Sequence, residues 1–199
     1  AFVCNSGCAN ASTGKRGYDN AVKICKRVAR HLGCDTRHVL ACSTGVIGHQ
    51  LPMEKILPGI DALAAQLDTG AAADARAARA IMTTDLVPKA AFREFKIGGR
   101  TITIGGLCKV SGMIAPNMAT LLAFITTDAD ITLPPLSSAL RDAANADASF
   151  NRISVDTDTS PSDTVAIMAS GLSDAKPIRK RDASYQRFAD ALIDLSRDL

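Results

Sequence analysis

The sequence predicts an α/β fold, a layered sandwich of mixed sheets and helices. Apolar runs of strand length, such as HVLACST (38–44) and TLLAFITTD (120–128), alternate with amphipathic helical segments along the 199-residue chain. In FREFKIGGRTITIGG (92–106), two alternating runs flank Gly98-Gly99, which predicts a hairpin. A chain that combines hairpins with helical crossovers is typical of layered α/β or α+β folds.

The first third of the chain predicts a strand, a helix and a second strand. AFVCN (1–5) has strand character, and the polar run NSGCANASTGKRG (5–17) predicts a loop. YDNAVKICKRVARHLG (18–33) predicts a helix, because its apolar residues fall on one arc at 100° per residue, and Gly33 ends it. The following run, HVLACST, is uninterrupted and apolar, so we expect a strand buried on both faces.

The remaining segments follow the same alternation. Helices are expected at LPMEKIL (51–57) and PGIDALAAQL (58–67), which Pro58 should separate, at AADARAARAIM (72–82), at LPPLSSALRDAANAD (133–147) with proline in its first turn, and at YQRFADALIDLSRDL (185–199). Strands are expected at TLLAFITTD, FNRISVD (150–156) and TVAIMAS (164–170). No clean linker interrupts the chain, which favours a single domain over residues 1–199.

Composition excludes several classes of function. The chain is 47% hydrophobic and 22% charged, as in ordinary globular proteins, and its net charge of +3 is too small to imply nucleic acid. Aromatic residues make up only 4%, and no apolar run approaches the length of a membrane span. The six cysteines contain no CxxC pair, and the three histidines lack zinc-ligand spacing, so we expect reduced thiols, no metal and a cytoplasmic location.

Three patterns have both a functional and a structural explanation. The basic arc of the first helix (Arg16, Lys23, Lys26, Arg27 and Arg30) could bind phosphates, but a solvated helix face is favoured. VDTDTSPSD (155–163) could hold a cation through Asp156, Asp158 and Asp163, but a polar turn capped by its own side chains is favoured. STGVIG (43–48) ends a strand with groups that suit an oxyanion, although a tight turn is the usual explanation.

Thr120 is a lone hydroxyl at the start of an apolar strand. A threonine hydroxyl needs a base, and its own α-amine, with a pKa of about 7.7–8.0, would serve if the preceding bond were cut. APNMA (115–119) suits such self-cleavage, because Pro116 disfavours a helix and Ala119 leaves its carbonyl uncrowded. For an arbitrary threonine at a strand start, a core position would be the preferred interpretation.

Several segments of the sequence resemble a known family, and this resemblance favours a nucleophile over a core position for Thr120. KVSGMIAPNMATLLAF (109–124) resembles the self-cleavage segment of the glutamate N-acetyltransferases, also called ornithine acetyltransferases. NSGCANASTGKRG, STGVIGHQLPMEKI, AIMTTDLVPK, FITTDADI and FNRISVDTDTSPSDT resemble further blocks in the family's order. The sequence departs from the pattern at Cys8 (usually Asn), at Thr157 (often Gly) and at SPSD (usually STND). Because family members also extend beyond both ends, we expect a central fragment that lacks a substrate-binding Glu and a C-terminal Asn and Thr.

The resemblance implies a role for particular residues. Thr120 would be the nucleophile of cleavage and acyl transfer, and the cut would fall between Ala119 and Thr120, leaving 1–119 in an alpha chain and 120–199 at the start of a beta chain. Thr44 and Gly45 would form the oxyanion hole. Thr83 and Lys109 would bind substrate together with Thr120.

The resemblance also implies a fold and a reaction. The fold would be the family's layered sandwich, with a threonine at a new N-terminus. The enzyme would transfer acetyl from N2-acetylornithine to glutamate in arginine biosynthesis, as a heterotetramer of two alpha and two beta chains. No cofactor or metal is implied, and acetyl-CoA stays open as a second donor. Two alternatives are an N-terminal-nucleophile amidase or aminopeptidase, which passes the acyl group to water, and an RNA-binding protein that uses the basic helix.

Overall fold

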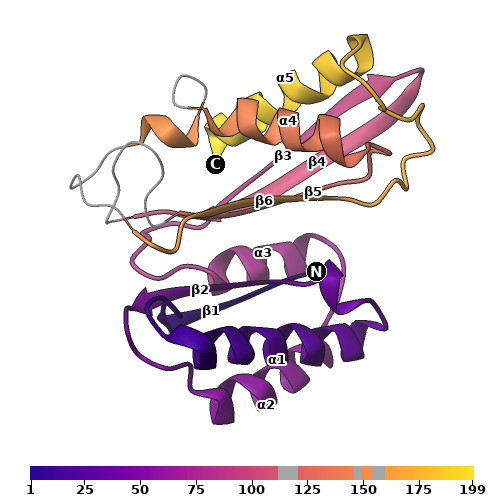
Figure 1. Ribbon diagram of the computed structural model, residues 1–199. Coiled ribbons are helices and arrows are strands. Elements are labelled where there is room, and N and C mark those ends of the chain that lie inside the picture. Colours follow the sequence, from indigo (N-terminus) through magenta and orange to yellow (C-terminus); the bar gives the residue numbers. More distant parts are fainter. Residues whose placement is uncertain (112–120, 146–148, 154–159) are drawn as a thin grey trace. The chain divides into compact units, whose positions relative to one another are not determined.

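The computed structural model describes residues 1–111, 121–145, 149–153 and 160–199 (Figure 1). These residues form two compact units, Ala1–Thr83 and Thr84–Leu199, and the boundary falls within AIMTTDLVPK. Each unit layers helices against β-strands, which confirms the predicted α/β class. None of the helices in the described ranges is long and apolar enough to cross a membrane.

The first unit is built on a parallel pair of strands. β1 (Phe2–Cys8) and β2 (Leu40–Val46) pair along their whole length, with α1 (Gly14–Leu32) between them in sequence. α2 (Met53–Ala64) packs against α1, and both helices lie on one side of the strand pair in Figure 1. The core of the unit contains Ile24, Leu51 and Ile60. A short 3-10 turn, η1 (Thr36–His38), and the Ala-rich α3 (Ala71–Ala80) complete it.

The second unit is a four-stranded sheet covered by two helices. Its strands are β3 (Lys89–Ile97), β4 (Arg100–Lys109), β5 (Leu122–Thr127) and β6 (Thr164–Ala169), in that spatial order. The first three are antiparallel, whereas β6 runs parallel to β5. α4 (Leu133–Ala144) and α5 (Ala183–Asp198) pack together on one face (Figure 1), where Phe188 and Leu192 are fully buried.

Several elements begin or end where glycine and proline in the sequence predict. Gly98 and Gly99 both have positive φ (58° and 82°) and join β3 to β4 in the two-residue turn that the hairpin pattern predicts. Gly33 ends α1 with φ 63°, in the left-handed conformation that glycine adopts without strain. Proline lies in the first turn of α4, as expected.

Four expectations about elements are wrong. NSGCANASTGKRG is not a loop throughout, because its first residues belong to β1 and its last to α1. Pro58 does not separate two helices, because α2 runs through it; Pro58 and Glu54 are both exposed, so water can satisfy the Glu54 carbonyl that loses its donor. β2 is not buried on both faces along its length: only Cys42 and Thr44 are buried, Ala41 and Ser43 are half-buried, and both ends of the strand are exposed, because β2 belongs to a sheet of only two strands. FNRISVD is not a strand in its described part, because Phe150–Arg152 forms a 3-10 turn (η2) closed by the Ile153 amide.

A close contact between two glycines fixes the register of β1 and β2. Gly7 lies opposite Gly45, and Gly45 has φ +130°. A Cβ atom on Gly45 would lie 2.4 Å from the Gly7 carbonyl carbon and 2.6 Å from its oxygen. No side chain fits there, since the obstructing atoms are backbone and the φ value already disfavours any residue with a Cβ.

We therefore expect Gly45→Ala to destabilise the full-length protein by about 1–3 kcal/mol, the range of one strained backbone position. Gly105→Ala in β4 is the matched control, because the added Cβ would meet its nearest atoms at 4.0 Å. Urea unfolding of both variants measures the difference. Equal midpoints for Gly45→Ala and the control would show that the glycine contact is unimportant.

Candidate functional site

The sequence-predicted site residues are divided between the two units. Thr44, Gly45 and Thr83 belong to the first unit, and Lys109 belongs to the second. Ala119 and Thr120 lie outside the described residues. Each unit therefore carries its own part of the predicted site.

In the first unit, the loops that follow β1 and β2 are joined to each other. The Ala9 amide donates to the Val46 carbonyl at 3.0 Å, and the Gly48 amide donates to the Ala11 carbonyl at 2.9 Å. The side-chain amide of Gln50 adds a bond to the Thr13 carbonyl at 3.0 Å. The parts of NSGCANASTG and STGVIG that follow the two strands, which lie far apart in the sequence, therefore form one structure at the carboxyl ends of the parallel strands.

Side-chain hydrogen bonds hold the two strands beneath these loops. The Ser43 hydroxyl donates to Asn5 Oδ1 at 2.7 Å, and Asn5 Nδ2 donates to the Cys8 carbonyl at 3.2 Å. In the loop after β1, the Thr13 hydroxyl donates to Asn10 Oδ1 at 2.9 Å. Asn10 has φ 51°, a left-handed conformation that asparagine tolerates better than most residues. The polar residues of this block thus fix the strand ends on which Thr44 and Gly45 lie.

Thr44 is buried within this arrangement, with 5% of its surface exposed, directly before the strained Gly45. Only one strand pairs with β2 in the described structure, so every second N–H group of β2 points away from β1. Rigid N–H donors at a strand end, next to a buried hydroxyl, are the groups that stabilise a developing oxyanion. The geometry here is consistent with the predicted roles of Thr44 and Gly45, which remain predictions.

In the second unit, Lys109 is the last residue of β4 and is 97% buried, with 3% of its surface exposed. It lies opposite Leu122, the first residue of β5. The neighbouring Cys108 is not a nucleophile, because burial raises the pKa of its thiol to about 12. Lys109 thus places a buried cationic side chain at this end of the sheet.

Asp85 anchors the chain that leaves β4. Its side chain is only 1% exposed, and it forms an ion pair with Lys89 at 2.6 Å. The same carboxylate oxygen accepts the Val110 amide at 2.8 Å, and the Ser111 hydroxyl donates to the Thr84 carbonyl at 3.0 Å. Asp85 was not predicted as a functional residue. Its spacing of four residues from Lys89 was the available signal, but the bond of Asp85 to Val110 depends on tertiary structure.

Asp163 holds the other side of the same connection. Its carboxylate accepts the Leu121 amide at 2.9 Å, while the Leu121 carbonyl accepts the Thr164 amide at 2.8 Å. Burial raises the pKa of the Asp163 carboxyl, and the Leu121 hydrogen bond and the positive charge of Lys109 oppose that effect. The residue that follows Thr120 in sequence is therefore fixed through both of its peptide groups.

Asp163 thus bonds to the residue just before β5. Neither interpretation of its loop, as a cation site or as a turn capped by its own side chains, predicted this contact. Asp156 and Asp158, the other two candidates for a cation site, lie outside the described residues. Within residues that the structure describes, no group of three His, Cys, Asp or Glu side chains could hold a metal ion.

The basic arc of α1 is only partly a solvated face. Arg16, Lys23, Lys26 and Arg30 are exposed, as the favoured interpretation predicts. Arg27 instead pairs with Asp61 of α2 at 3.2 Å, and His31 contacts the same carboxylate at 2.7 Å. The hydrogen bond with His31 is the largest effect that lowers the pKa of the Asp61 carboxyl. These contacts fasten α1 to α2.

Comparisons with known proteins identify the family of this chain. The model of the ArgJ family matches residues 1–199. Curated relatives include the arginine biosynthesis bifunctional proteins ArgJ of Symbiobacterium thermophilum (49% identical over 96% of this chain) and Geobacillus kaustophilus (46% identical over 100%). The chain spans 47% and 48% of those two proteins, about half the length of the curated relatives it matches.

Solved structures point in the same direction. The crystal structure of ArgJ from Bacillus halodurans is 43% identical with a TM-score of 0.53, and the match covers 59% of this chain and 61% of that one. Ornithine acetyltransferase from Mycobacterium tuberculosis, solved with ornithine, is 34% identical with a TM-score of 0.50 over 61% and 62% of the two chains. A family match over the full chain, with relatives near half identity, leads to one conclusion: the chain belongs to the ArgJ family.

Proposed function

We propose that the protein to which this chain belongs transfers an acetyl group from N2-acetylornithine to glutamate in arginine biosynthesis, in the cytoplasm, after cleaving itself between Ala119 and Thr120. Family membership supports the reaction class. The observation that carries the cleavage site is the fixation of both flanks of its segment: Asp85 holds Val110, and Asp163 and Thr164 hold Leu121. A self-cleaving peptide bond must be presented in one geometry, and anchored flanks favour this.

The proposed cleavage begins when the Thr120 hydroxyl attacks the Ala119 carbonyl. The peptide C–N bond breaks as an ester C–O bond forms, and the proton passes from the hydroxyl to the new amine. Water then hydrolyses the ester, which leaves the Ala119 carboxylate and a free Thr120 amine. With a pKa of about 7.7–8.0, that amine suits a general base at neutral pH.

Acyl transfer uses the same hydroxyl twice. The amine of Thr120 takes the hydroxyl proton as the oxygen attacks the acetyl carbonyl, and ornithine leaves with that proton. The amine of glutamate then attacks the acetyl-threonine ester and regenerates the hydroxyl. Thr44 and Gly45 would stabilise each tetrahedral oxyanion, and this is covalent catalysis in two half-reactions.

Lys109 has two compatible roles in this scheme. A buried ammonium attracts a substrate carboxylate strongly, because the low local dielectric weakens its charge less than water does. The same charge disfavours a second ammonium nearby, which would keep a Thr120 amine neutral and able to accept a proton. Thr83 is the further substrate contact in the proposal. No cofactor takes part, acetyl-CoA enters only as a second acetyl donor, and the assembly is the heterotetramer of two cleaved halves.

Transfer and hydrolysis give different products from the same substrate. Full-length protein incubated with N2-acetylornithine carrying a labelled acetyl group and with glutamate should yield labelled N-acetylglutamate, because the amine of glutamate captures the ester. Mass spectrometry measures the label. Labelled free acetate as the main product would support the N-terminal-nucleophile amidase instead.

Thr120 should be essential to both steps. We expect Thr120→Ala to abolish cleavage and transfer, and Thr120→Ser to retain part of each because serine keeps the hydroxyl. Denaturing electrophoresis follows cleavage, and the labelled-acetyl assay follows transfer. An alanine variant that is still cut at this position would remove Thr120 from the mechanism.

Thr44 should contribute to the barrier rather than to substrate affinity. Loss of one oxyanion donor raises a barrier by about 2.7–4 kcal/mol, so Thr44→Ala should lower kcat by roughly a hundredfold or more with little change in KM. Thr44→Ser is the matched control, because it keeps the hydroxyl at this buried position. An unchanged kcat with a raised KM, in a variant whose unfolding midpoint is normal, would contradict the assignment.

A further inference from the structure

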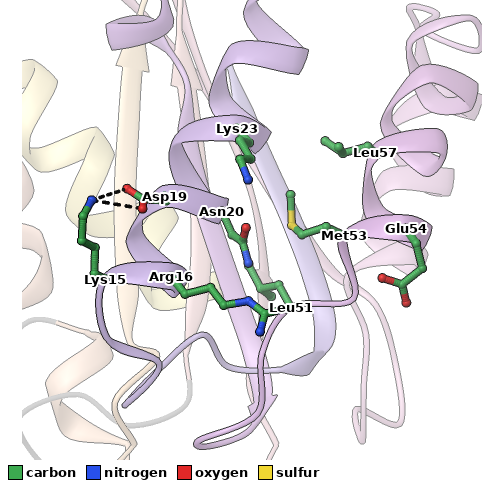
Figure 2. A pocket seen from close by; sticks show the side chains of 9 residues that line it. All are labelled: Lys15, Arg16, Asp19, Asn20, Lys23, Leu51, Met53, Glu54 and Leu57. Atoms are coloured by element: carbon green, nitrogen blue, oxygen red, sulfur yellow. Dashed lines mark hydrogen bonds and ion pairs between the residues drawn. The ribbon is translucent and has the colours of Figure 1, made fainter.

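The first unit contains a cavity of about 540 Å³ beside the start of α1 and the start of α2 (Figure 2). Arg16, Asn20 and Lys23 line it from α1. Because these positions are spaced by four and three residues, their side chains share one face of the helix. Leu51, Met53 and Leu57 form the apolar part of the lining, from the segment that enters α2 and from α2 itself.

Asn20 is the unusual member of this lining. Only 4% of its surface is exposed, yet within the described ranges its side-chain amide has no hydrogen-bond partner. Figure 2 shows the amide directed toward the space between α1 and the Leu51–Met53 segment. The amide atoms are not among the fully buried polar atoms that lack a partner, so they stay open to the cavity, where the amide can donate to water or to a polar ligand.

The charges around Asn20 favour an anion. Lys15 is engaged with Asp19 at 3.0 Å, whereas Arg16 and Lys23 form no ion pair with any residue that the structure describes. Glu54 is the remaining acid of the lining, and in the described residues it forms no ion pair with Arg16 or Lys23. The first turn of α1 carries no acidic residue, and neither α1 nor α2 has a side-chain cap at its N-terminus within the described residues. The start of α1 therefore adds partial positive charge at the cavity, whereas Glu54 in the first turn of α2 offsets the charge of that helix end.

We propose that this cavity binds an organic phosphate monoester. The phosphate oxygens would accept hydrogen bonds from the Arg16 guanidinium, the Lys23 ammonium and the Asn20 amide. An apolar group of the ester would lie against Leu51, Met53 and Leu57. Two cations match a dianion, and the amide supplies the fixed donor that a solvated basic face lacks. The site goes beyond acyl transfer, since none of its residues takes part in the chemistry of Thr120.

Calorimetric titration of the full-length protein with phenyl phosphate tests the proposal. Arg16→Gln should weaken binding by about tenfold, the smaller effect expected for a lost hydrogen bond to a charged group. Asn20→Asp keeps the shape of the side chain but places a negative charge against the phosphate, so it should weaken binding at least as much. Lys26→Gln is the matched control, because Lys26 is an exposed cation of the same helix outside the cavity lining.

The proposal also predicts how tightly simpler probes bind. Inorganic phosphate should bind more weakly than phenyl phosphate because it lacks the apolar group, and phenol should bind more weakly because it lacks the charge. The Thr120→Ala variant should bind phenyl phosphate like the wild type, which separates this site from the proposed reaction. Absence of phenyl phosphate binding, or equal losses in Arg16→Gln and Lys26→Gln, would overturn it. Phenol that binds as tightly as phenyl phosphate would do the same.

Discussion

The two hydrogen bonds at Leu121 determine how the second unit is built. Its amide is held by the Asp163 carboxylate and its carbonyl by the Thr164 amide. This places the start of β5 between β4 and β6, where Ala123 and Ile125 are completely buried. It also sets Leu122 opposite Lys109, so that a buried ammonium lies at the strand end that follows the proposed cleavage site.

In the first unit, the corresponding constraint is the contact between Gly7 and Gly45. Backbone atoms approach there more closely than any side chain allows. The contact aligns β1 and β2 so that both strands end at the same level, and the loops that follow them exchange hydrogen bonds. Buried Thr44 is held at this end, as the proposed oxyanion site requires. A glycine that looks like an ordinary turn residue in the sequence is thus needed for a close approach of backbones.

Features with local causes could be predicted from the sequence, and features with distant partners could not. The Gly98-Gly99 turn and the Gly33 end of α1 follow from the backbone freedom of glycine. The prediction that Pro58 separates two helices was wrong because its turn is exposed, so water can replace the lost hydrogen bond. The periodicity of a helix gives no information about such exposure. In the site, the sequence suggested Thr44 and Lys109 by resemblance, and their burial was unforeseen. Asp85 was missed because its bond to Val110 joins residues that only the folded sheet brings together.

The central claim is that the chain is cut before Thr120 and that this residue becomes a new N-terminus. Intact mass spectrometry of the full-length protein, purified without protease, tests this most directly when combined with N-terminal sequencing. The account predicts two chains, one ending at Ala119 and one whose first residue is Thr120. A single uncut chain in a protein that transfers acetyl groups at full rate would contradict it, because Thr120 would then have no free amine to act as a base.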